Sequence, residues 1–84
     1  MVAYMSNLDS YNEVFIEVFG VSVDVLSDYK YQDTASWDSV GHMMMIVALE
    51  EKFNIIMDSD DIVDFSSWSK GITILKKYDV DIVV

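Results

Sequence analysis

Apolar residues recur at intervals of three and four positions along much of this chain, which is the spacing of amphipathic helices. In the stretch 39–53, one arc of a helix would carry the apolar set His42, Met45, Ile46, Leu49 and Phe53 toward a core. The opposite arc would carry Gly41, Met44, Ala48 and Glu51. Asp38 precedes this stretch, and its carboxylate can accept hydrogen bonds from the N–H groups of a first helical turn.

The same pattern predicts further helices on either side of this one. We expect helices over 6–19, 39–53, 59–65 and 67–78, and a loosely held tail over 79–84. Ser6 or Asn7 can cap the first helix, and Gly20 is a natural stop. The segment 21–25 alternates like a strand. No second alternating run offers it a partner, however, and a lone strand leaves its backbone groups unpaired.

Composition indicates a single domain over residues 1–84, and the helices predicted above make its fold class all-α. The chain is 52% hydrophobic, with 3 Gly and no Pro, so it can bury one core and does not have the composition of a disordered segment. It has no Cys, which excludes disulfides, a thiol nucleophile and thiolate metal ligands. A domain of this size without such links must rely on helix packing.

The charge balance narrows the classes of partner. Fifteen acidic against 5 basic residues give a net charge of −10. This disfavours nucleic acid, whose binding depends on basic side chains, and favours basic protein surfaces. The longest apolar run, 43–49, is far shorter than the about 20 residues of a membrane span. Residues 1–6 have no basic region before an apolar stretch, so we expect no secretory signal and a cytoplasmic location.

Ser39 is the residue that stands out chemically. As the first residue of its helix, it would point its side chain away from the packed turns. An anionic group on its oxygen would then gain about 0.3–1 kcal/mol from the positive end of the helix. A phosphodiester would therefore be well placed there.

An ordered set of short motifs around Ser39 carries a family resemblance. The set is Asp38-Ser39-Val40, then Leu49-Glu50-Glu51 near the end of the same helix, then Asp60-Asp61-Ile62 at the start of the next. Asp-Ser alone means little, since it also occurs at 9–10 and 58–59. The whole order, in a chain of this length, resembles the acyl carrier proteins from Leu8 to Tyr78.

This resemblance implies a four-helix carrier bundle in which a long loop over 20–37 crosses the helices, with one short helical turn near 25–28. The rings of Tyr29, Tyr31 and Trp37 could anchor such a loop on the core. The resemblance also implies that Ser39 carries 4′-phosphopantetheine, transferred from coenzyme A. The thiol of that group would hold acyl or aminoacyl groups as thioesters.

A carrier of this kind has no catalytic activity of its own. Its expected partners are a phosphopantetheinyl transferase, an acyl- or aminoacyl-loading enzyme, and a condensing or acyl-transferring enzyme. We expect the carrier itself to be a monomer. We expect these partners to be recognised through the side chains around Ser39, namely Asp38, Val40, Met44, Val47, Glu50, Glu51, Asp60 and Asp61. The acidic residues of this set form a solvated face that attracts basic surfaces of a partner. An exposed Met44 instead favours a partner that has an apolar docking patch.

Three alternatives use the same residues differently. The main one is an unmodified acidic helical module that binds partners without a prosthetic group. A small hydrolase using Ser39 would need a placed base and oxyanion donors. His42 is the only histidine, and it could be such a base, contact the phosphopantetheine group, or simply pack beside the first turn of the helix. We favour the packed histidine, because no second histidine or suitably spaced acid completes a catalytic relay. Residues 58–69 lack the glycine and the closing glutamate of a calcium loop.

Overall fold

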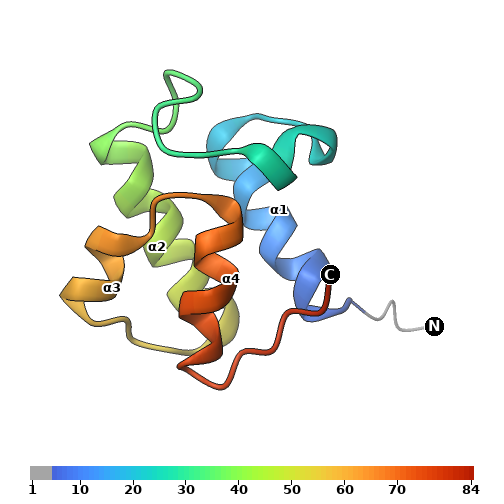
Figure 1. The fold of residues 1–84 in the computed structure, drawn as a ribbon, viewed down its shortest axis with the longest axis vertical. Coiled ribbons are helices and arrows are strands. Elements are labelled where there is room, and N and C mark those ends of the chain that lie inside the picture. The colour runs from blue at the N-terminus through green and yellow to red at the C-terminus, as the bar shows by residue number, and fades with distance from the viewer. Residues whose placement is uncertain (1–4) are drawn as a thin grey trace.

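The computed structural model describes residues 5–84, and within that range every regular element is a helix. The helices are α1 (Asn7–Phe19), the 3-10 helix η1 (Val23–Asp28), α2 (Ser39–Phe53), α3 (Ser59–Asp64) and α4 (Trp68–Lys76). Figure 1 shows α1, α2 and α4 gathered around a common interior, with α3 at the edge and the loop before α2 crossing one end. The all-α prediction is therefore confirmed. The prediction that residues 1–6 contain no secretory signal falls mainly on residues 1–4, which lie outside the described range.

The predicted caps form where the sequence places them. The Ser6 hydroxyl accepts a hydrogen bond from the Asp9 N–H at 3.1 Å, and the Asp9 carboxylate accepts one from the Ser6 N–H at 3.3 Å, which is a capping box. Asp38 caps α2 in the expected way, and Asn54 ends it with a left-handed φ of 53°. The bounds predicted for α2 are confirmed because local hydrogen bonds set both of its ends.

Two helices end earlier than predicted, and α1 and α4 each begin one residue later, at Asn7 and Trp68. α3 ends at Asp64 and α4 ends at Lys76, not at 65 and 78. Asp79 adopts a φ of 62°, and the Val80 N–H donates to the Leu75 carbonyl at 3.1 Å. The chain therefore turns sharply after α4 instead of continuing its helix.

Aromatic rings fill the interior between α1 and the loop that precedes α2. Trp37 is fully buried. Its ring stacks on Phe19 with centroids 4.9 Å apart and meets the edge of Phe15 at 5.6 Å. Tyr29 is also buried, at 5.0 Å from Trp37, whereas Tyr31 is 38% exposed. Two of the three predicted anchors thus lie in the core, and the third lies at its margin.

Backbone hydrogen bonds hold the same loop to the start of α4. The Tyr31 N–H donates to the Ser66 carbonyl, and the Trp68 N–H donates to the Tyr29 carbonyl, each at 2.9 Å. Of the strand-like residues 21–25, the last three begin η1 and none joins a sheet. Over the described residues, the only extended pairing is an isolated bridge between Lys30 and Ser67.

The segment after α4 is packed as far as Ile82, so the prediction of a loosely held tail is wrong for residues 80–82, whereas Val83 and Val84 are exposed. Val80 and Ile82 are buried, and the Asn7 side-chain amide donates to the Asp81 carbonyl at 3.0 Å. Figure 1 shows this segment returning from the end of α4 to the start of α1. The alternating apolar residues 80 and 82 supply the contact because the segment is extended. None of the helices described is both long and apolar enough to cross a membrane.

Candidate functional site

The Ser39 side chain is exposed at the first position of α2. Asp38, just before it, is extended and accepts a hydrogen bond from the Gly41 N–H on its Oδ1 at 2.8 Å. The Asp38 carbonyl accepts from the His42 N–H, also at 2.8 Å. The Ser39 hydroxyl therefore stands at the positive end of a well-capped helix.

Gly41 explains how the loop can approach this helix start so closely. The sequence analysis placed Gly41 on the outward arc of the helix, which is wrong because Gly41 is buried. A Cβ atom at this position would lie 2.0 Å from the Ser36 carbonyl oxygen and 3.3 Å from the Phe19 ring. Only a residue without a side chain lets the backbone at Ser36 rest on the first turn of α2.

His42 is a structural residue, since hydrogen bonds occupy both ring nitrogens. Its Nδ1 accepts from the Trp37 Nε1–H at 3.0 Å, which leaves Nε2 to donate to the Ile62 carbonyl at 2.7 Å. The ring also meets the edges of Tyr31 and Phe65. The preferred prediction of a packed histidine is confirmed, and neither nitrogen is free to act as a base on Ser39.

A pocket of about 330 Å³ opens beside Ser39, between the first turn of α2 and α3. It is lined by Tyr31, Ser39, His42, Met43, Ile62, Val63, Phe65 and Ser66. Its volume lies at the small end of the range for ligand sites. Most of the lining is apolar, and Ser39 is one of its few polar residues.

The residues on the α3 side of this pocket were not predicted as site residues. A weak signal was present, since Ile62 and Val63 are adjacent apolar residues in an acidic helix. Neighbouring positions on a helix point about 100° apart, so one of the pair can reach the core while the other stays outside. Ile62 is half-buried and Val63 is exposed.

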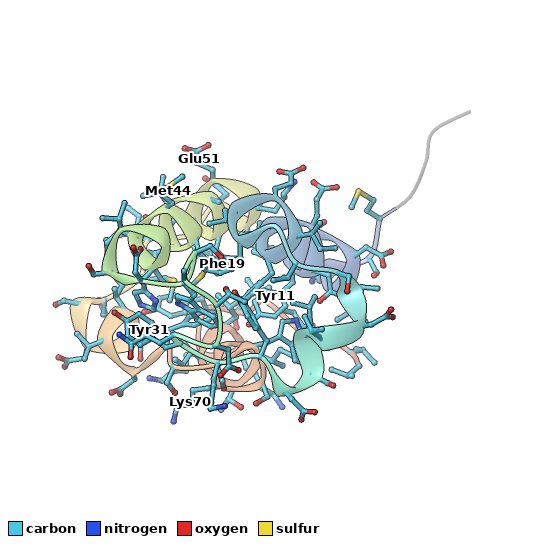
Figure 2. The ribbon with its side chains drawn as sticks, turned by 90° about the horizontal axis from the view of Figure 1, so that it is seen from above. Tyr11, Phe19, Tyr31, Met44, Glu51 and Lys70 are labelled. Carbon is cyan, nitrogen blue, oxygen red and sulfur yellow. The ribbon has the colours of Figure 1, made fainter. Side chains whose placement is uncertain are left out.

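The predicted recognition residues fall into two groups, of which the first is exposed. Five of them, Asp38, Val40, Met44, Val47 and Glu51, are exposed along α2 or its cap. Asp60 is exposed on α3. Figure 2 shows Met44 and Glu51 pointing outward from α2, away from Tyr11 and Phe19 in the interior.

Glu50 and Asp61 form the second group, and both are engaged inside the molecule. Glu50 is half-buried, and its Oε2 accepts from the Met57 N–H at 2.9 Å. Asp61 is buried, so its placement on a solvated recognition face is wrong. Its carboxylate accepts from the Lys77 Nζ at 2.7 Å and from the Tyr78 hydroxyl at 2.6 Å. These two bonds tie α3 to the end of α4.

The electrostatics of this tie follow from its hydrogen bonds. The bond from Lys77, and then the one from Tyr78, hold the pKa of Asp61 below its ordinary value. The bond to Asp61 correspondingly raises the pKa of Lys77 and that of Tyr78. The Tyr78 hydroxyl also accepts from the Asp58 N–H at 2.9 Å. The Tyr78 side chain therefore bonds both to Asp58, just before α3, and to Asp61 in its first turn.

The arrangement limits what Ser39 can do chemically. Among residues 5–84, no three His, Asp or Glu side chains are grouped to hold a metal ion. The one histidine is fully hydrogen-bonded, so the base that a serine hydrolase needs is not supplied. What the site offers is an accessible hydroxyl, a positive helix end and an apolar pocket.

Comparisons with protein-family models, with curated proteins and with solved structures give no match for this chain. The resemblance to acyl carrier proteins therefore rests on residues 8–78 of the sequence alone. The roles of Ser39, of a cofactor and of partner enzymes stay predictions.

Proposed function

We propose that this protein is a carrier, with Ser39 as the attachment site for 4′-phosphopantetheine. One observation carries the proposal: the Ser39 hydroxyl is exposed at the first residue of a capped helix and borders an apolar pocket. The ordered motifs of the sequence support it. The resemblance to acyl carrier proteins likewise predicts their four-helix arrangement for this chain.

The residues present fit the implied prosthetic group. The first-turn N–H groups and the dipole of α2 favour a phosphodiester on Ser39. When bound, the group supplies a thiol that carries acyl or aminoacyl groups as thioesters. Asp38 and the packed Gly41 keep the helix start rigid, so the attachment point stays in one place.

Attachment requires a separate enzyme. The Ser39 oxygen would bond to the pantetheine-side phosphorus of coenzyme A, the pyrophosphate would break, and 3′,5′-ADP would leave. The hydroxyl proton would pass to a base of the phosphopantetheinyl transferase, because His42 has no free nitrogen. A loading enzyme and a condensing or acyl-transferring enzyme would then use the carrier, which itself performs no chemistry.

Intact-mass measurement after co-expression with a broad-specificity transferase tests this proposal. We expect a gain of one phosphopantetheine, lost in Ser39→Ala. Ser59→Ala is the matched control, because Ser59 also follows an aspartate and also begins a helix. It should keep the gain. A modification that survives Ser39→Ala, or no gain with several transferases, would contradict the proposal.

The second candidate is an unmodified acidic module that binds partners through its surface. The exposed apolar side chains along α2 favour it, because they need no prosthetic group to make contact. An unchanged mass in cells that contain an active transferase would support this candidate.

A further inference from the structure

Three hydroxyl groups between η1 and α2 form one continuous row of hydrogen bonds. The Ser36 hydroxyl donates to the Phe19 carbonyl at 2.8 Å. Because a hydroxyl has a single proton, the Ser36 oxygen must accept its second bond, which comes from the Thr34 hydroxyl at 2.9 Å. For the same reason, the Thr34 oxygen accepts its bond from the Tyr29 hydroxyl. All three bonds of this hydroxyl network (Tyr29, Thr34 and Ser36) therefore run in one direction, toward α1.

Both ends of the hydroxyl network are anchored on packed parts of the molecule. Tyr29 is buried in the aromatic cluster, with its ring centroid 5.7 Å from that of Phe19. Phe19 is the last residue of α1, and carbonyls at the end of a helix have no partner within the helix. The Ser36 hydroxyl supplies that partner, so the loop is held to the end of α1 at the point where it approaches α2.

The backbone of Ser36 extends this restraint to the start of α2. A Cβ atom at Gly41 would lie 2.0 Å from the Ser36 carbonyl oxygen, so the loop rests directly on the first turn of the helix. Ser36 therefore contacts α1 through its side chain and α2 through its carbonyl, three positions before Ser39. Asp38 caps this turn, but its bonds to Gly41 and His42 are local and do not tie the turn to another helix.

We propose that Ser36 is a positioning residue for the modification of Ser39, an inference that rests on the proposed function. The Ser39 oxygen has to approach the phosphorus of coenzyme A within a narrow range of positions, and a displacement of about 1 Å can lower a rate by about 100-fold. Helix ends fray readily, and Ser39 is the first residue of α2. By joining the loop to α1, Ser36 keeps this first turn closed while a transferase acts on it.

Ser36→Ala tests this role through the separate effects on kcat and KM. The side chain is exposed, so its removal leaves no cavity, and the exposed residues of α2 stay available to a partner enzyme. With coenzyme A and a broad-specificity transferase, we expect kcat to fall about tenfold, while KM for the carrier changes by less than about twofold. Ser36→Thr keeps the hydroxyl and should restore most of the rate. An unchanged kcat in Ser36→Ala, or no recovery in Ser36→Thr, would overturn the proposal.

Ser6→Ala is the matched control, because the Ser6 hydroxyl also binds the backbone at one end of α1, the end opposite Phe19. This variant should lose stability, as Ser36→Ala does, but keep the wild-type kcat. Urea unfolding measures the stability of both. An equal fall of kcat in the two variants would mean that loss of stability alone slows the transfer, and would contradict the proposal.

Thr34→Val tests the contribution of the hydroxyl network beyond Ser36 itself. Valine keeps the shape of threonine but can neither donate to Ser36 nor accept from Tyr29, whereas the bond from Ser36 to Phe19 remains. We therefore expect a fall in kcat that is smaller than in Ser36→Ala. A larger fall would assign the positioning role to Thr34 and overturn that of Ser36.

Hydrogen exchange gives a measurement that does not depend on any enzyme. The Gly41 and His42 N–H groups bond to Asp38, and these bonds open when the first turn of α2 frays. Ser36→Ala should speed their exchange about tenfold, whereas Ser6→Ala should leave it unchanged. Unchanged exchange in Ser36→Ala would contradict the proposal. A wild-type protein that gains no phosphopantetheine overturns both proposals, whereas a modified wild type with an equally fast Ser36→Ala overturns this one alone.

Discussion

The two sides of α2 are held by different forces. On the side of α1, Trp37, just before the start of α2, packs in a closed cluster of aromatic rings with Phe15, Phe19 and Tyr29. On the side of α3, the His42 ring of α2 donates to the Ile62 carbonyl, and Asp61 in turn ties α3 to the end of α4. The first kind of contact is broad and non-directional, whereas the second depends on a few atoms.

The difference matters because α3 has only six residues. A helix of that length is not stable by itself, so its position is set by its tertiary bonds. α3 also forms one wall of the pocket beside Ser39. The mobile part of the site should therefore be the α3 wall, while Ser39 itself stays on the rigid part.

Removing the central ring should produce the largest effect. Trp37→Ala empties a fully buried site, and we expect a loss of about 3–5 kcal/mol in the free energy of unfolding. Urea unfolding followed by circular dichroism measures it. Trp37→Phe, which keeps a ring but loses the bond to His42, should cost clearly less. Equal losses in both variants would mean that the indole hydrogen bond outweighs ring packing.

Removing the histidine should cost less and should act locally. His42→Leu leaves the Trp37 N–H and the Ile62 carbonyl without their partner, for which we expect a loss of about 1–3 kcal/mol. Hydrogen exchange should speed up most in residues 59–65. His42→Gln can both accept and donate, so it should restore part of the protection. Faster exchange spread evenly over α1 and α3 would contradict a local role.

The smallest expected effect is a pH dependence from Asp61. Because its pKa is lowered in the folded state, the unfolded state binds more protons, so its contribution is present above about pH 4. That contribution is lost as the pH falls through the lowered pKa. The stability difference between wild type and Asp61→Asn should therefore shrink from pH 6 toward pH 2. A difference that stays constant over this range would show that the carboxylate charge is unimportant.

The sequence was a good guide wherever neighbours in the chain decide the structure. Asp38 and Asn54 bound α2 through contacts within a single turn, so both ends of that helix were predictable. Trp37 and Tyr29 pack in the core as anchors of the loop, but aromatic character alone did not distinguish them from Tyr31, which is 38% exposed. The outward prediction for Gly41 was wrong because glycine has no side chain, so the apolar pattern could not show that the backbone of Ser36 packs against it.

What the sequence determined by itself is the existence of α1, α2, α3 and α4, the caps of α1 and α2 and an outward serine at the start of α2, because local hydrogen bonds and apolar spacing specify these. Only the tertiary structure decided that His42 bonds to Ile62 and Asp61 to Lys77, which lie 20 and 16 residues away in the chain. It also decided that residues 80 and 82 pack instead of trailing. Such contacts depend on how the helices meet in space, and no short-range pattern encodes that.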